Sequence, residues 1–191
     1  MKTLVLFDFD HTLYKKDSLL EVTKFIAGHT KFSIGMAALM PYLIGMKLGL
    51  IKNQVVKERY LSHFFKDADY TLFTEKAKQF ALTRIEKDLD EVLEQVLAKH
   101  ISQGDEVYIV TASFTEWLKP WCDTKGIQLI ASQLEIAHNK ITGTIKGCNC
   151  YGQEKVNRIT QHINTSIYHS IYVYGKGKGD REMLTLKRNC E

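Results

Sequence analysis

Two aspartates stand two residues apart directly after an apolar run near the start of the chain. The run reads LVLFDFDHTL over residues 4–13, and the carboxylates belong to Asp8 and Asp10. In an extended segment, side chains two residues apart leave on the same side, so both carboxylates can face one ligand. Neighbouring carboxylates repel each other unless a cation or a proton intervenes. The pattern favours an aspartate nucleophile with a neighbouring general acid and a magnesium site over a solvated acidic loop.

Three later segments carry polar groups suited to an anionic ligand. YIVTASF ends in the Thr111 hydroxyl and the backbone amides of Ala112 and Ser113, which would be free to bind a phosphate oxyanion before a helix. Lys155 opens a predicted helix in YGQEKVNRI. In YVYGKGKGDREML, three glycines precede Asp180, a candidate third carboxylate near the metal, and glycines let a backbone approach a ligand closely. Taken singly, the first of these segments is more typical of a helix cap, and the lysine of a solvated surface.

Four short apolar runs predict the strands that position these residues, at 3–9, 106–110, 128–131 and 170–174. Helical patterns separate or follow them at 88–104, 115–125 and 153–162, and a last helix is predicted from about Gly179. Strands that alternate with helices predict a three-layer, Rossmann-like α/β fold with a parallel sheet and helices on both faces. The carboxyl ends of such strands are where open α/β sheets place ligands.

Two segments have specific end or turn signals. The pattern at 88–104 has an apolar stripe of helical spacing, a capping box from Asp88 and Glu91, and a stop at Gly104. The stripe consists of Leu89, Val92, Leu93, Val96, Leu97 and Ile101. The alternating stretch KITGTIK at 140–146 predicts a small hairpin or ribbon centred on Gly143.

About 70 residues separate the first two predicted strands, which is far more than one crossover helix needs. Helical patterns fill this interval, the first of them capped by Asp17 or Ser18 and stopped by Gly28. The others lie at 32–46, 53–65 and 69–84. We expect a catalytic core formed by residues 1–13 and 85–191, with a helical cap inserted at 14–84.

The run at 32–46 has no charged side chain. With about 15 residues it is shorter than the roughly 20 needed to span a bilayer, and Pro41 is expected to interrupt it. It forms either the apolar core of the cap or a surface that dips into a membrane. The flanking Lys31, Lys47 and Lys52 would suit an anionic bilayer.

Composition is that of one globular domain with an insertion, since 45% of the 191 residues are hydrophobic and 25% are charged. A net charge of +4 is too small to indicate a nucleic-acid partner. The first apolar run ends in carboxylates, so it reads as a buried strand and not as an export signal. Cys148 and Cys150 are interpreted as a packed pair and not as a metal site; with Cys122 and Cys190, they suit reduced thiols in the cytoplasm.

Taken in order, the four polar segments resemble those of the haloacid dehalogenase superfamily, in the branch of phosphoserine phosphatases with a helical cap. The resemblance implies that Asp8 forms an aspartyl-phosphate and that Asp10 protonates the leaving oxygen and then activates water. It implies that Thr111 holds the phosphoryl group and that Lys155 neutralises this group and orients Asp8. It also implies Mg²⁺ at Asp8, at the backbone carbonyl of Asp10 and at an acid of the fourth segment, for which Asp180 is the candidate.

Two stretches, LIASQLEI at 129–136 and CNCYGQEKV at 148–156, resemble the phosphatidylglycerophosphatase type C group within this branch. One position departs from the family pattern: Lys176 stands where a carboxylate is expected to ligate magnesium. We expect its ammonium to reach toward Asp8 and Asp10 and to weaken the metal site.

The sequence thus predicts a magnesium-dependent phosphate monoester hydrolase whose activity Lys176 impairs. Its substrate would be a small phosphorylated molecule or the phosphate of a phospholipid, met in the cytoplasm or at the inner face of the membrane. The alternative is a catalytically silent protein of the same fold that binds phosphate or lipid.

Overall fold

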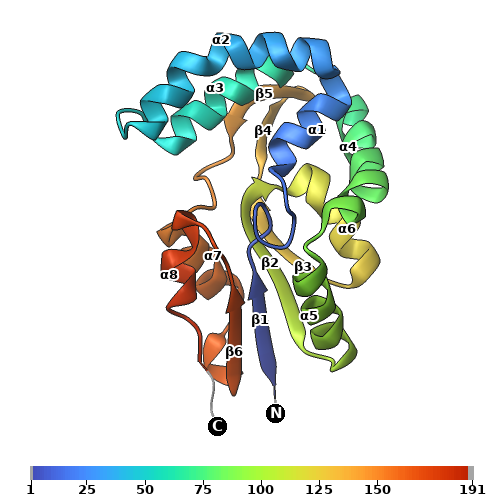
Figure 1. The fold of residues 1–191 in the computed structure, drawn as a ribbon, viewed down its shortest axis with the longest axis vertical. Helices are drawn as coiled ribbons and strands as arrows, with labels where there is room; N and C mark the ends of the chain where they lie inside the picture. The colour runs from blue at the N-terminus through green and yellow to red at the C-terminus, as the bar shows by residue number, and fades with distance from the viewer. Residues whose placement is uncertain (1, 189–191) are drawn as a thin grey trace.

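The centre of the molecule is a four-stranded parallel sheet with helices against both faces (Figure 1). This computed structural model describes residues 2–188. The strands are β1 Thr3–Phe7, β2 Glu106–Phe114, β3 Gln128–Ser132 and β6 Ser170–Tyr174, in the order β3-β2-β1-β6. The predicted α/β fold is confirmed. Strands β2 and β3 lie on one side of β1, whereas β6 lies on its other side. The strand order therefore changes direction at β1, and a ligand crevice is expected at its carboxyl end.

Alternation along β1 produces two separate cores. Val5 and Phe7 pack into one core and Leu4 and Leu6 into the other, all with no exposed surface. The helices that pack on the faces of the sheet are α5 Glu91–Ser102 and α6 Thr115–Lys125 at the first core, and α7 Gln153–His162 and α8 Arg181–Leu184 at the second. The first core also continues into the helices between residues 18 and 84. Each such side chain contributes about 1.5–3 kcal/mol when buried, so β1 is fixed from both faces.

The start of α5 differs from the prediction. A 3₁₀ turn, η1 Ile85–Asp88, precedes the helix, and the Asp90 carboxylate caps it by accepting the Leu93 N–H at 3.1 Å. The expected capping box of Asp88 and Glu91 is therefore wrong. The apolar stripe is also narrower than expected, since Val92 is 70% exposed.

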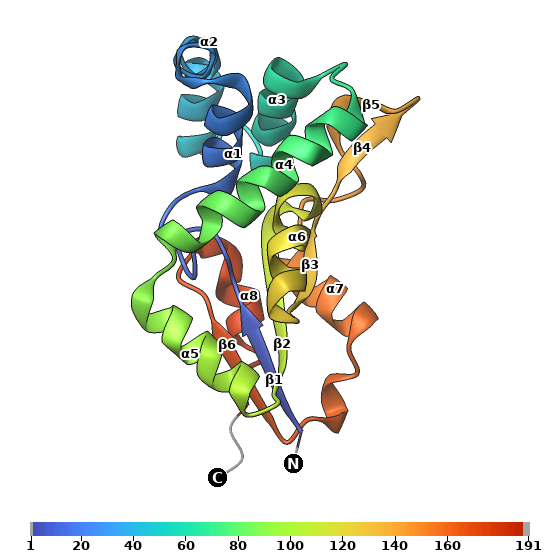
Figure 2. The ribbon, with the colours of Figure 1, turned by 90° about the vertical axis from the view of Figure 1, so that its right-hand side faces the viewer.

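Four helices lie over the carboxyl end of the sheet (Figures 1 and 2). They are α1 Ser18–Ala27, α2 His29–Lys47, α3 Asn53–Phe65 and α4 Tyr70–Arg84. The predicted limits of α1 are confirmed, because the Asp17 carboxylate accepts the Leu20 N–H at 3.1 Å and Gly28 ends the helix.

The expected interruption at Pro41 is wrong, because α2 continues through it. Pro41 and Ala37 are both exposed, so the Ala37 carbonyl that proline leaves without a helical partner lies on the solvent side of the helix. Only Gly35, Leu39 and Gly45 of α2 are buried, so this segment contributes to the apolar core of the cap on one side only. Within residues 2–188, no helix has the length and apolarity needed to cross a membrane.

The predicted hairpin is present, and it packs against the helical layer, a contact that the sequence did not predict. Its strands are β4 Leu134–Ala137 and β5 Lys140–Ile145, and the backbone of Ile141 exchanges hydrogen bonds with Asp67 and Ala68 at 2.9 and 3.0 Å. The turn lies at His138 and Asn139, which have positive φ, and not at the expected Gly143.

Gly143 has another role, because it lies inside β5 with φ +90° and faces α3. A Cβ placed there would lie 2.5 Å from the Ser62 hydroxyl oxygen and 2.7 Å from the Ser62 Cα. The second of these atoms is backbone and cannot rotate away. The glycine therefore allows α3 to lie directly on the hairpin.

We expect Gly143→Ala to lower the free energy of unfolding by about 1–3 kcal/mol, because it combines backbone strain with overpacking. Urea denaturation followed by circular dichroism would measure this. The matched control is Gly49→Ala, which has a similar φ of +76° but no atom within 4 Å of the added Cβ. Equal losses in the two variants would show that the contact with α3 contributes nothing.

Candidate active site

The turn after β1 carries the two aspartates to a cavity of about 280 Å³. The Asp8 N–H donates to the Tyr174 carbonyl at 2.8 Å, which continues the pairing of β1 with β6 by one residue. A tight turn follows, in which His11 has φ 59°. The predicted residues that line the cavity are Asp8, Asp10, Thr111, Ala112, Lys155 and Asp180. The turn after β1, the end of β2, the segment after β6 and the start of α7 therefore supply one site.

Lys155 joins the first and fourth segments. Its ammonium donates to Asp8 Oδ1 and to Asp180 Oδ1, both at 2.6 Å, and all three residues are buried. Burial acts to lower the pKa of Lys155, but the two carboxylates outweigh it and raise that pKa. Lys155 therefore stays charged and holds both carboxylates in place.

The two aspartates after β1 have different surroundings. Asp8 accepts hydrogen bonds from Thr12 Oγ1 at 2.9 Å and from Lys155; burial raises its pKa, and Lys155 opposes that shift. Asp10 accepts the Ser18 N–H at 2.8 Å and, among the described residues, has no ammonium beside it comparable to Lys155. Burial raises the pKa of Asp10 to about 8, and the nearby Asp17 carboxylate adds to the shift. A protonated Asp10 thus lies near an Asp8 that is paired with a cation.

The Thr111 segment differs in part from the prediction. Residues 111–113 belong to β2, which runs on to Phe114 with a shifted register, and α6 begins directly after it, as expected. The Ser113 N–H is not free, since it donates to Thr111 Oγ1 at 3.0 Å. The Ser113 hydroxyl contacts Ser18 and Trp117 instead of the cavity. Thr111 and Ala112 line the cavity and remain candidates for phosphate binding.

The cap supplies cavity residues that the sequence analysis missed, above all Lys57 of α3. Its ammonium donates to the Ala112 carbonyl at 2.8 Å and to Asn149 Oδ1 at 3.3 Å, and burial lowers its pKa. Asp17, Asn53 and Tyr151 also line the cavity. No local pattern distinguishes Lys57 from the other lysines of the cap, because its role depends on how α3 packs over β2.

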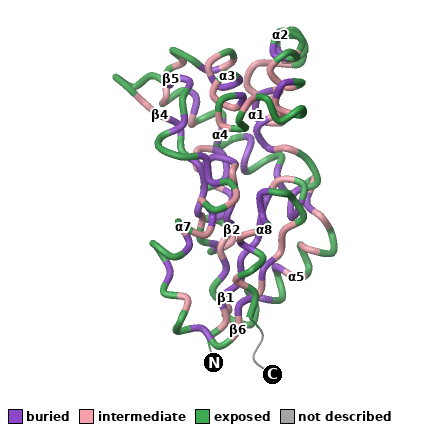
Figure 3. Tube along the Cα trace, turned by 90° about the vertical axis from the view of Figure 1, so that its left-hand side faces the viewer, coloured by how far each residue is buried: buried purple, intermediate pink, exposed green. Residues whose placement is uncertain are grey.

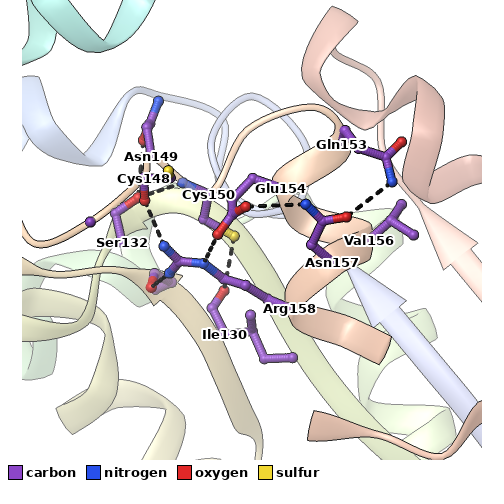
Figure 4. A network of polar contacts seen from close by, with 12 residues as sticks. Ile130, Ser132, Cys148, Asn149, Cys150, Gln153, Glu154, Val156, Asn157 and Arg158 are labelled. Carbon is purple, nitrogen blue, oxygen red and sulfur yellow. Dashed lines mark hydrogen bonds and ion pairs between the residues drawn. The ribbon is translucent and has the colours of Figure 1, made fainter. Parts of the chain in front are cut away.

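Asn149 connects the cap to the core through a buried polar network. Its side chain accepts from Ser132 Oγ at 3.0 Å and donates to Asn53 Oδ1 at 2.9 Å. Figure 4 shows the loop that carries Asn149 held by Arg158, which donates to the Cys148 carbonyl at 2.5 Å and to Glu154 at 2.8 Å. These contacts fix the loop beside the cavity.

The cysteines of this loop are not the packed pair that we expected. Cys150 is buried, whereas Cys148 is exposed, and both are free thiols, as is Cys122. Cys190 lies outside the described residues.

The donor atoms fit Mg²⁺, which takes oxygen ligands and completes one or two carboxylates with water and phosphate. Asp8 and Asp180 lie on either side of Lys155, so two carboxylates share a single ammonium. No cluster of three or more His, Cys, Asp or Glu side chains within residues 2–188 is arranged to hold a metal. A bound ion would therefore depend on two carboxylates, the Asp10 carbonyl, water and substrate.

Lys176 does not reach toward Asp8 and Asp10, contrary to expectation. Its side chain is 58% exposed, and its ammonium lies 3.6 Å from Asp90 Oδ2 at the start of α5. The Lys176 ammonium therefore does not compete with a metal ion for Asp8 and Asp10, although position 176 still lacks the carboxylate of the family pattern.

Comparisons with known proteins agree with this geometry. Residues 5–185 match the model of the family described as haloacid dehalogenase-like hydrolase. Protein CicA of Caulobacter vibrioides is 30% identical over 185 residues, which is 96% of this chain and 82% of CicA.

Two solved structures show the same fold. A protein of unknown function from Bordetella pertussis Tohama I has a TM-score of 0.82 and 23% identity, covering 98% of this chain and 87% of that one. A phospho-aspartyl intermediate analogue of phosphoserine phosphatase has a TM-score of 0.70 and 18% identity, covering 97% of this chain and 83% of that one. The expected likeness to the phosphoserine phosphatase branch is thus confirmed for the fold. Because the family match spans nearly the whole chain, the protein belongs to the haloacid dehalogenase-like hydrolase family.

Proposed function

We propose that the protein is a magnesium-dependent phosphate monoester hydrolase that works through an aspartyl-phosphate at Asp8. The observation that carries the proposal is the Asp8 carboxylate at the end of β1, held by Thr12 and Lys155 and facing the cavity. Membership of a hydrolase family supports it, and the retained Asp10 and Thr111 do so as well.

In the first step, an Asp8 oxygen attacks phosphorus, and the bond from phosphorus to the leaving oxygen breaks. The proton on Asp10 passes to that oxygen, so an alcohol leaves. Thr111 binds a phosphoryl oxygen through its hydroxyl, while Lys155 keeps the Asp8 carboxylate ionised and fixed. Positioning and charge neutralisation of this kind account for most of the catalysis of phosphoryl transfer.

In the second step, the Asp10 carboxylate takes a proton from water, whose oxygen attacks the phosphorus. The bond between phosphorus and Asp8 breaks, inorganic phosphate leaves, and Asp10 is protonated again. Asp8, Asp180 and the Asp10 carbonyl would hold Mg²⁺, which would supply positive charge to the phosphoryl oxygens.

The cap, which we assign to residues 14–84 together with the hairpin, would select the leaving group. We propose a small phosphorylated molecule or the phosphate of a phospholipid as substrate, met in the cytoplasm or at the inner face of the membrane. The resemblance to the phosphatidylglycerophosphatase type C group stays a prediction. The alternative of a catalytically silent binding protein is less favoured, because the buried Asp8, Lys155 and Asp180 are all retained.

Asp8→Asn should lower turnover of an aryl phosphate at least about 1,000-fold, since an amide cannot attack phosphorus effectively. The fold should persist, because Lys155 keeps its bond to Asp180. Beryllium fluoride should form an adduct at Asp8 of the wild-type protein. The control Asp123→Asn changes an exposed carboxylate and should leave turnover intact. Near-native turnover in Asp8→Asn would disprove the assignment.

Turnover of an alkyl phosphate should fall above about pH 8, by about tenfold per unit, because Asp10 then has no proton to give. An aryl phosphate, with a better leaving group, should show a weaker fall. In Asp17→Asn the fall in turnover should begin at a lower pH, because the variant lacks a carboxylate that raises the pKa of Asp10. Asparagine can still cap α1, so the helix should be unaffected. If turnover of the Asp17→Asn variant began to fall at the same pH as that of the wild type, Asp10 would be excluded as the acid.

Lys176→Asp should strengthen Mg²⁺ binding at least about tenfold and raise turnover, because it restores the carboxylate that the family pattern has at this position. Titration calorimetry with Mg²⁺ alone measures the affinity independently of activity. Lys176→Gln is the control, since it removes the ammonium without adding a carboxylate ligand. Its affinity for Mg²⁺ should stay close to that of the wild type. An unchanged affinity in Lys176→Asp would show that position 176 lies outside the metal shell.

A further inference from the structure

The outer side of α2 is an exposed apolar surface. Figure 1 shows α2 running across the end of the molecule that lies farthest from both termini. We define the docking face as Ile34, Met40, Ile44, Leu48 and Leu50, which are 66%, 49%, 52%, 68% and 79% exposed. In Figure 3 much of α2 is coloured as exposed. Five large apolar side chains in one helix and the turn after it exceed the scattered exposure of an ordinary surface.

The opposite side of α2 already has its partners. A Cβ on Gly35 would lie 2.3 Å from the Phe64 ring of α3, and one on Gly45 would lie 2.7 Å from Ile51. Leu39 is buried in the core of the cap. Rotation of α2 therefore cannot bury the docking face without losing these contacts. A helix that is apolar all round is normally covered on all sides, so the docking face requires an external cover.

Charge around the docking face indicates what covers it. The sequence has no Asp or Glu between Val22 and Lys57. Lys31 lies near one end of the face, and Lys47 and Lys52 lie near the other. Among the described residues, none of these three lysines forms an ion pair. The face thus combines apolar side chains with uncompensated positive charge at both ends.

A second copy of the chain fits this pattern poorly. Packing α2 against α2 in either direction would bring lysines of the two copies together, with no acid in the segment to pair with them. An anionic lipid surface provides both an apolar layer and negative headgroups.

We propose that the docking face binds the surface of an anionic bilayer, with α2 lying flat in the headgroup region and no segment crossing it. The flanking lysines then contact lipid headgroups. α3 begins at Asn53, directly after this face, and its Asn53 and Lys57 line the catalytic cavity. This proposal does not rest on the proposed function, because docking needs no turnover.

Co-sedimentation tests the proposal with vesicles of phosphatidylcholine alone and of equal parts phosphatidylcholine and phosphatidylglycerol. The wild-type protein should bind the second kind and not the first. Ile34→Glu and Leu48→Glu should each weaken binding at least about tenfold. Lys47→Gln and Lys52→Gln should each weaken it about fivefold, and high salt should act in the same direction.

The matched control is Val92→Glu, which introduces the same charge at a 70% exposed apolar position of α5 and should bind like the wild type. The Asp8→Asn variant should also bind normally, so loss of catalysis and loss of docking can be distinguished. Absence of binding to phosphatidylglycerol vesicles would overturn the proposal. So would a dimer in sedimentation velocity that Ile34→Glu dissociates, since a second copy would then cover the face.

Discussion

The ammonium of Lys155, which lies between two buried carboxylates, sets the constraint on which the rest of the site depends. Removing the ammonium would leave two buried carboxylates without a counter-charge, and an uncompensated buried charge costs about 3–5 kcal/mol. The start of α7, the end of β1 and the turn at η3 Lys178–Asp180 must therefore meet at one point. Glycines make the last of these possible: a Cβ on Gly175 would lie 2.8 Å from the Asp180 Cβ, and the Gly177 N–H donates to Asp180 Oδ2 at 2.8 Å.

Unequal charge pairing distinguishes the two aspartates after β1. Asp8 has a cation at 2.6 Å, whereas Asp10 has one backbone N–H and a neighbouring carboxylate. One of two chemically identical groups is thereby suited to attack and the other to carry a proton. Their separation by a single residue places this difference within one turn of the backbone.

The sequence predicted what local patterns determine. The limits of α3, α7 and β6 agree with the predicted 53–65, 153–162 and 170–174, because apolar spacing and caps define these elements. The hairpin turn was misplaced, since His138 and Asn139 adopt positive φ while Gly143 serves a contact with α3. Such a contact joins residues far apart in the chain and has no local signal.

The same distinction applies to the candidate site. Asp8 and Asp10 follow β1, and Thr111 lies near the end of the neighbouring β2, so their proximity could be predicted from the sheet. The positions of Lys57 and of the Lys176 ammonium could not, because they depend on how α3 packs on β2 and on where α5 begins.

The strand order has a consequence for the path of folding. β1 is synthesised before the other three strands of its sheet, yet Thr3 pairs with Ser170, and Leu4 pairs with Glu106 on the other side. Pairings between such distant residues slow folding, because loop closure must precede the contacts that reward it. During synthesis the central strand and the cap helices emerge long before β6. The four-stranded sheet can be completed only when β6 has been made, so the apolar residues of β1 remain a hazard for aggregation until then.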